Sequence, residues 1–311
     1  MPERPHPVIL NREDAEKLVA THFSAQRELI DELANYGSNL CLRTYNVSSK
    51  NLGDLVACGV LLKQVVTMLD ATSELFKAGC IYAANLPARA GFEASLYLEW
   101  MLASDLDRKA HYYYVANLRS ERHWALRAIK GTAEHGDFAT TMGQLGVDLA
   151  ILRPSLKGEA EKHLTEVNRI LAQQEFSAID EEFTNKRGKK SKHDPEWYSL
   201  LGVNSVRQIA ERLHRLAEYD LFYARGSTVT HAASYKDHVR FGAGQVRFKQ
   251  IRSLDGIDAL LNFIVAFAIR SYQWVLTYYR PDELPRFWDQ YRKDWRSPFV
   301  SVKEVVYRSD I

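Results

Sequence analysis

The sequence predicts an all-α protein, a multi-helix bundle with one small β-hairpin. Apolar residues recur at the 3.6-residue spacing of a helix along most of the chain, and glycine or proline stands between the periodic segments. The alternation typical of strands occurs once, near residues 238–252, where Val239, Phe241, Val246 and Phe248 flank a glycine-containing turn. Helical periodicity covers residues 12–36, 50–80, 87–102, 105–130, 156–175, 205–235 and 255–279.

Local signals place the ends of several of these helices. Gly79 follows an apolar stripe and predicts that the helix stops there. Pro87 suits a first turn, so the next helix is expected to begin at this residue. Ser205 is a candidate N-cap for a later helix, and Pro281 is expected to end the long helix near the C-terminus.

Changes in composition divide the chain into three expected parts. Residues 1–49 form an N-terminal helical segment, residues 50–281 the main helical domain, and residues 282–311 an aromatic tail that packs on the body. Within the main domain, residues 184–195 contain no apolar side chain and many lysines, which predicts a basic loop.

The bulk composition limits the classes of protein that fit. The chain has 311 residues, 46% of them hydrophobic, which is enough for a packed core. A net charge of +2 does not indicate a general nucleic-acid binder, although local patches matter more than the sum. Three cysteines without a Cys-x-x-Cys spacing argue against a disulfide framework or a zinc site. The start of the chain lacks a secretory signal, and the most apolar segment, residues 260–269, is too short to span a bilayer. We therefore expect a cytoplasmic protein that makes no membrane contact.

The most function-like segment runs from Tyr223 to His231. Gly226 and the residues after it are poor helix formers, so they reduce the stability of any helix formed here. In a helix, Tyr223, Ser227 and His231 share a face, and the long side chain of Arg225 reaches the same groove. Arginine suits phosphate oxygens and histidine exchanges protons near neutral pH, so Arg225 and His231 are candidate catalytic residues for metal-free RNA cleavage. Spacing alone favours a structural role, in which these side chains satisfy buried polar neighbours.

A second polar pair, Arg89 and Glu93, lies one helical turn apart among large apolar residues. Such surroundings predict partial burial, and buried charges need partners. We therefore expect Arg89 and Glu93 to pair and to support the site, with Glu93 holding Arg225 or His231. Gly91, between them, permits close approach of another helix.

Weaker signals complete the set of candidates. Lys189, Lys190 and Lys192 in the basic loop are candidate contacts for substrate phosphates, with a solvated loop as the alternative. Glu211 and His214 have a metal-ligand spacing but no matching second pair in the main domain, so we expect no metal. The chain has no glycine-rich phosphate loop and no nucleophile elbow, and no cofactor is expected.

The motif of Arg89 and Glu93 and the motif of Tyr223, Ser227 and His231 together indicate a family resemblance. The chain resembles, over about residues 50–235, a widespread bacterial family of unknown function with an Arg-x3-Glu motif on one helix and a Tyr-x3-Ser-x3-His motif on a later one. The same arrangement is similar, more distantly, to the HEPN superfamily of helical ribonucleases, in which an arginine and a histidine with four to six residues between them form a metal-independent site. Many HEPN nucleases place a polar residue directly after the arginine, whereas this chain has Gly226.

The HEPN resemblance implies a ribonuclease that acts as a toxin or in phage defence. It implies RNA as substrate, Arg225 and His231 as catalytic residues, and a homodimer in which two motifs face one cleft. The alternative is a non-catalytic helical module that binds a protein, for instance a regulatory partner, or a nucleotide. In that case the Arg89–Glu93 and Ser227–His231 pairs are internal clamps that fix helix register.

Overall fold

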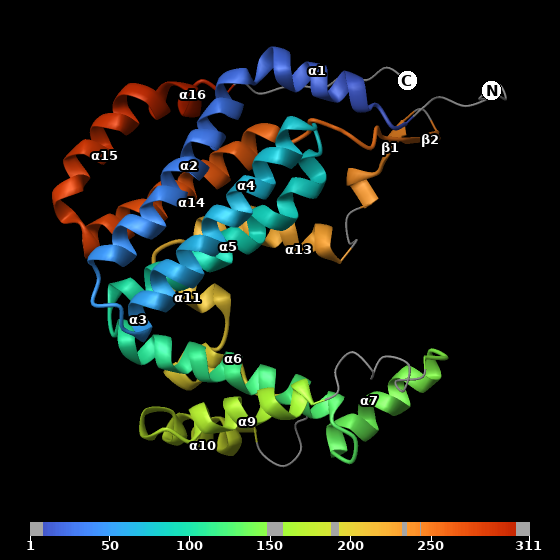
Figure 1. Cartoon of the computed structure of the whole chain (residues 1–311). Coiled ribbons are helices and arrows are strands. Elements are labelled where there is room, and N and C mark those ends of the chain that lie inside the picture. The colour runs from blue at the N-terminus through green and yellow to red at the C-terminus, as the bar shows by residue number, and fades with distance from the viewer. Residues whose placement is uncertain (1–8, 148–157, 188–192, 232–234, 243, 303–311) are drawn as a thin grey trace. The chain divides into compact units, whose positions relative to one another are not determined.

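A computed structural model describes residues 9–147, 158–187, 193–231, 235–242 and 244–302 (Figure 1). In these ranges the chain is mostly helical with a small antiparallel hairpin, which confirms the predicted fold class. The chain divides into two compact units: unit 1 is Met1–Ser104 with Val206–Ile311, and unit 2 is Asp105–Ser205. The boundaries expected near residues 49 and 281 fall inside unit 1 and stay predictions.

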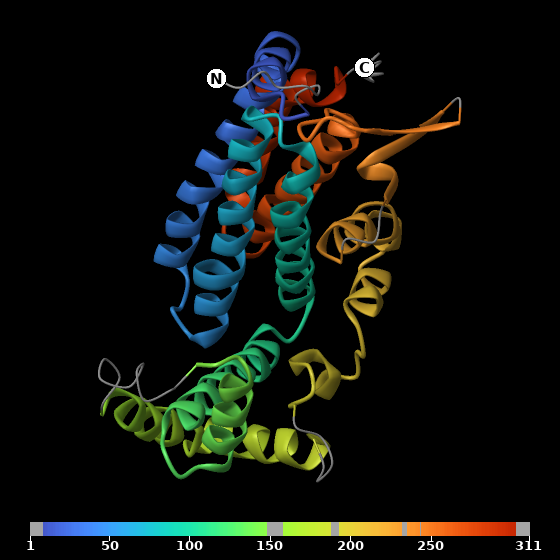
Figure 2. The ribbon, with the colours of Figure 1, turned by 90° about the vertical axis from the view of Figure 1, so that its right-hand side faces the viewer.

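Four long helices form the core of unit 1: α2 (Ser24–Val47), α4 (Lys63–Lys77), α5 (Ile81–Ala103) and α14 (Ile257–Tyr279). Figure 2 shows α2, α4 and α5 as neighbouring, roughly aligned helices. Their buried faces carry large apolar side chains, among them Leu33, Leu69, Phe92 and Phe267. A Cβ atom on Gly91 would lie 3.1 Å from Phe267 Cζ, so the expected close helix packing at this glycine is confirmed.

Up to α5, one predicted helix end, at Gly79, is confirmed, whereas the single helix predicted over residues 12–36 and the helix start predicted at Pro87 are wrong. α1 (Arg12–His22) and α2 are separate helices, because the backbone leaves helical geometry at Phe23. α3 (Leu52–Asp54), a π-helical stretch η1 (Leu55–Leu62) and α4 form one run that ends as predicted at Gly79, which has a φ of 69°. The predicted start at Pro87 is wrong: α5 begins at Ile81 and contains Pro87. Burial of Ile81 and Ala84 favours the extra turn over the hydrogen bond that proline lacks.

The chain returns to unit 1 through short elements. These are α11 (Val206–Arg212), α12 (Leu216–Glu218), η4 (Tyr219–Tyr223), α13 (Ala224–Thr230) and η5 (Tyr235–Asp237). The continuous helix expected over residues 205–235 is therefore wrong. His214 has a φ of 57°, which breaks the helical path after α11, and α13 ends at Thr230.

The predicted hairpin is present. β1 (Val239–Gly242) and β2 (Gln245–Phe248) pair antiparallel, with Val239 opposite Phe248. After α14, the elements η6 (Pro281–Glu283), α15 (Leu284–Gln290), η7 (Tyr291–Trp295) and α16 (Arg296–Val300) complete unit 1. Trp295 is fully buried, and its Nε1 donates to Glu32 Oε2 of α2 at 3.0 Å.

Unit 2 contains α6 (Leu106–Ala128), α7 (Ala133–Gln144), α9 (Glu159–Leu171), α10 (Gln174–Arg187) and η3 (Trp197–Leu201). Arg119 of α6 is 3% exposed and binds Asp180 and Asp194, which ties α6 to α10 and to the segment before η3. The predicted basic loop over residues 184–195 begins later than expected, since α10 continues to Arg187.

Two helical runs, Leu52–Lys77 and Ile257–Tyr279, are long and apolar enough to cross a membrane by length and composition alone. About half of the first run and more of the second is buried inside the protein. Core helices of soluble proteins have the same character, so these helices are weak evidence for a membrane span.

Candidate functional site

Tyr223, at the end of η4, lies between the two charged residues of α5 that the sequence analysis singled out. Its hydroxyl donates to Glu93 Oε2 at 2.7 Å and accepts from Arg89 Nη2 at 3.2 Å. The Arg89 guanidinium also lies over the Tyr223 ring, with its Cζ 4.4 Å from the ring centroid. Arg89 and Glu93 therefore interact through the tyrosine hydroxyl, and the expected direct pair is wrong within the described residues. We call Arg89, Glu93 and Tyr223 the Tyr223 cluster.

The Tyr223 cluster is largely enclosed. Tyr223 is 7% exposed, and Arg89 and Glu93 are partly buried, as their apolar neighbours predicted. Burial raises the pKa of the Tyr223 hydroxyl to about 12; Glu93 acts in the same direction and Arg89 opposes it. The phenol is therefore neutral near pH 7 and serves as a hydrogen-bond donor. Glu93 accepts a second hydrogen bond from Tyr97, whereas Arg89 Nη1 is buried without a hydrogen-bond partner in the described part of the chain.

Gly226 explains how α13 approaches α5 so closely. A Cβ atom at this position would lie 2.8 Å from Arg89 Cβ and 3.2 Å from the carbonyl oxygen of Asn85. Both neighbours are parts of α5 that cannot move without shifting the helix. Packing of α13 against α5 therefore favours glycine at the position after Arg225.

Arg225 and His231 lie at the surface, in contrast to the cluster beneath them. Both residues are exposed, and Ser227 is partly exposed. The Arg225 guanidinium lies beside Gly256, whose added Cβ atom would be 3.1 Å from Nη2. His231 follows the last turn of α13, and its backbone N–H donates to the Ser227 carbonyl at 3.1 Å. We call Arg225, Ser227 and His231 the α13 surface group.

The expected contact from Glu93 to Arg225 or His231 is wrong. Among the residues that the structure describes, the carboxylate of Glu93 binds the hydroxyls of Tyr97 and Tyr223. His231 is exposed, and no side-chain hydrogen bond joins it to Ser227 among the residues that the structure describes. The three lysines proposed for substrate binding, Lys189, Lys190 and Lys192, lie outside the described residues.

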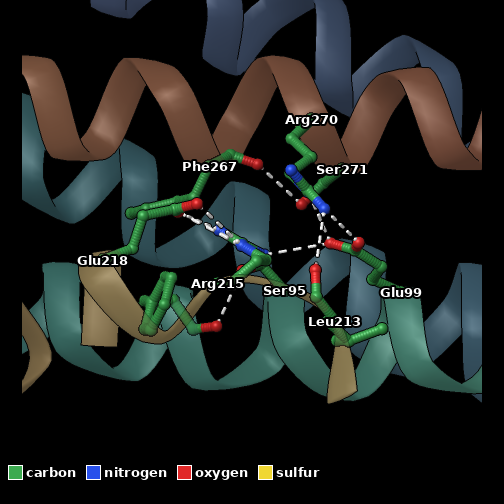
Figure 3. Close-up of polar contacts among 9 residues, drawn as sticks. Ser95, Glu99, Leu213, Arg215, Glu218, Phe267, Arg270 and Ser271 are labelled. Carbon is green, nitrogen blue, oxygen red and sulfur yellow. Dashed lines mark hydrogen bonds and ion pairs between the residues drawn. The ribbon is translucent and has the colours of Figure 1, made fainter. Parts of the chain in front are cut away.

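Sequence reasoning missed a second polar cluster in unit 1, drawn in Figure 3. The Arg215 side chain is fully buried and donates to Glu99 Oε2 at 3.2 Å, to Ser95 Oγ at 3.1 Å and to Glu218 Oε2 at 2.6 Å. Arg270 of α14 binds the other oxygen of Glu99 at 2.6 Å, and this hydrogen bond raises the pKa of Arg270. We call these five residues the Arg215 network.

The Arg215 network adjoins the Tyr223 cluster through one aromatic ring. Arg215 Cζ lies 4.6 Å from the Phe92 centroid, and the Phe92 and Tyr223 rings are 6.1 Å apart. With two arginines and two glutamates the network is balanced in charge, which makes its burial tolerable. A signal for it existed in the sequence, since Glu99 stands among apolar residues of α5, but its partner lies 116 residues away.

The described residues contain no group of three or more histidine, cysteine, aspartate or glutamate side chains that could hold a metal ion. This part of unit 1 presents an arginine and a histidine at the surface, beside a hydrogen-bonded polar interior. Such an arrangement defines a helical protein with an exposed Arg–His group on a short, anchored helix.

The chain belongs to a family of unknown function, DUF5677, whose model matches residues 54–244. That range contains Arg89, Glu93 and the segment from Tyr223 to His231, and it agrees with the family of unknown function expected over residues 50–235. No curated protein and no solved structure gave a significant match.

Proposed function

We propose that this protein is a metal-independent ribonuclease, similar to the HEPN enzymes, with Arg225 and His231 as its catalytic residues. The observation that carries the proposal is the contrast within one short segment. Tyr223 is buried and held by Arg89 and Glu93, while Arg225 and His231 a few residues later are exposed. A helix that is anchored on one side can present fixed groups to a ligand on the other.

The chemistry follows from the two side chains. The 2′-hydroxyl of the RNA loses its proton and its oxygen bonds to the adjacent phosphorus. The bond from phosphorus to the 5′-oxygen breaks, and that oxygen takes up a proton. The products are a 2′,3′-cyclic phosphate and a 5′-hydroxyl end. His231 moves the proton, and Arg225 stabilises the charge that develops on the phosphate oxygens.

The remaining residues act indirectly. Ser227, one turn before His231, would orient the imidazole or the phosphate. Arg89, Glu93 and Tyr223 are positioning residues, since they hold the segment that carries the surface group. Lys189, Lys190 and Lys192 remain proposed contacts for the RNA backbone. A cytoplasmic nuclease of this kind would arrest growth when expressed, as toxins and phage-defence effectors do.

The test is cleavage of a mixed-sequence RNA by purified protein in the presence of EDTA. We expect cleavage with cyclic-phosphate ends, and its loss in His231→Ala and Arg225→Ala. His22→Ala, an exposed histidine on α1, is the matched control and should retain full activity. Equal cleavage by the wild type and by His231→Ala would contradict the mechanism.

A second function is favoured by a specific contact. The Arg225 guanidinium, although exposed, lies beside Gly256, the residue that precedes α14. This contact supports a non-catalytic module in which the Tyr223 cluster fixes helix register and the surface binds a protein or nucleotide partner. Absence of RNA cleavage, together with a loss of stability in the Arg225→Ala variant, would favour this module.

A further inference from the structure

An open groove lies between α2 and the run of η1 and α4, on helices that carry none of the proposed site residues. Its volume is about 630 Å³, and its walls come from both helices. Four of the lining residues, Lys63, Val66, Thr67 and Asp70, follow one another at helical spacing and form a single stripe along α4. α2 and α4 lie side by side in Figure 2.

One large apolar side chain on the groove wall is exposed, and two more are exposed on the adjoining η1. Leu42, on the α2 wall, is 68% exposed, and the adjoining η1 exposes Leu55 at 44% and Val60 at 39%. Gly59 lines the groove and has open space above it, because an added Cβ atom would meet a single atom within 4 Å, Leu55 Cδ1. A backbone without a side chain lets another helix come close. An exposed apolar side chain beside such a position favours docking of another helix.

The charges along the α4 stripe indicate which partner fits the groove. Lys63 and Asp70 are exposed, and neither has an ion-pair partner among the residues that the structure describes. They stand seven residues apart, so they lie about 10 Å from each other on nearly the same line of the helix. Val66 and Thr67 occupy the midpoint. A second α4 laid antiparallel on the first therefore brings each lysine opposite an aspartate.

We propose that this groove is a self-complementary interface, and that a second copy of the chain docks on it about a two-fold axis near Val66 and Thr67. The two-fold axis runs across the helices, because an axis along them would place Lys63 against its own copy. Lys63 of each copy pairs with Asp70 of the other, and Leu42 is covered. This interface is independent of the proposed nuclease activity.

Charge reversal tests the interface without disturbing the core, since both residues are exposed. We expect sedimentation velocity to find the wild type as a dimer at micromolar concentration. Lys63→Glu and Asp70→Lys should each raise the dissociation constant by about tenfold or more, because every dimer then has two like-charged contacts. An equimolar mixture of the two variants should dimerise again, as should the double variant, because opposite charges meet once more.

Lys17→Glu on α1 is the control, because it reverses an exposed lysine away from the groove and should leave the dimer intact. Circular dichroism of each variant checks that the helices are retained. A monomeric wild type would overturn the proposal, including the case in which a small molecule or another protein fills the groove. Dimers that are insensitive to both reversals, or a mixture that fails to reassociate, would overturn it as well.

Discussion

The Arg215 network and the α13 surface group both contain arginine in unit 1, yet they differ in almost every physical respect. Arg215 is fully enclosed and its donors are met by two carboxylates and a hydroxyl. Arg225 is exposed and lies against a glycine. A charge that is buried must be paired to be tolerated, whereas an exposed charge is available to a ligand. The difference separates residues that hold the bundle together from residues that could act on a substrate.

The largest effect is expected at the Arg215 network. Arg215→Met removes the guanidinium and leaves Ser95 and Glu218 without their partner and Glu99 with Arg270 alone. The free energy of unfolding should fall by about 3–5 kcal/mol, the range for breaking a buried ion pair. Urea denaturation measures this loss. The control is Arg207→Met, which removes an exposed pair with Asp220 and should cost less than about 1 kcal/mol. Equal losses of stability in both variants would contradict the claim that the buried ion pairs of Arg215 stabilise the fold more than the exposed pair of Arg207 does.

The next effect concerns the contact that anchors α13. Gly226→Ala places a methyl group 2.8 Å from Arg89 Cβ, so α13 must move away from α5. We expect a loss of about 1–3 kcal/mol from overpacking, although alanine is the better helix former. Gly136→Ala in α7 is the matched control, because nothing lies within 4 Å of its added Cβ atom. That variant should gain up to about 1 kcal/mol by helix propensity. Stabilisation in both variants, measured by thermal melts, would contradict the close crossing.

Tyr223→Phe should have an effect of similar size to that of Gly226→Ala, with a clear dependence on pH. The variant leaves Arg89 Nη2 and Glu93 Oε2 without the hydroxyl, which should cost about 1–3 kcal/mol at neutral pH. The pKa of Tyr223 is about 12 in the folded protein, above the value of about 10 for an unfolded chain. Its contribution is therefore complete below pH 10 and is lost as the pH rises toward 12. The difference in stability between wild type and variant should shrink over that window. A constant difference between pH 9 and pH 12 would argue against a raised pKa.

The smallest effect on stability is expected at the surface. Arg225→Ala and His231→Ala should each change the free energy of unfolding by less than about 0.5 kcal/mol, because both side chains are exposed. Chemical denaturation of the two variants beside the wild type checks this. If either variant lost several kcal/mol of unfolding free energy, the substituted residue would have a structural role.

The same comparison explains what the sequence could and could not predict. The spacing of Arg89 and Glu93 on one helix, amid apolar residues, was enough to predict that they are partly buried, but the predicted direct pair was wrong. Their true link, Tyr223, lies 130 residues from Glu93, and a single sequence carries no signal for that pairing. The Arg215 network was missed for the same reason. The helix start predicted at Pro87 was wrong because proline is tolerated inside α5, where burial of apolar side chains outweighs one lost hydrogen bond.

Exposure, too, could not be derived from spacing. Helical geometry placed Ser227 and His231 one turn apart, and the structure agrees along the backbone. Whether that face meets the core or the solvent depends on how α13 crosses α5, which Gly226 decides through its contact with Arg89. The position of a glycine in the sequence indicates tolerance for close packing, but it does not identify the neighbour.

The contrast between buried scaffold and exposed surface is tested most directly by the rate of RNA cleavage by His231→Ala. The rate is measured in EDTA, on variant protein whose free energy of unfolding equals that of the wild type. Our account predicts that cleavage is lost by at least about a hundredfold, as for removal of a general acid or base, while the protein stays fully folded. Cleavage at the wild-type rate by that folded variant would contradict the account, because the exposed histidine would then have no part in the chemistry.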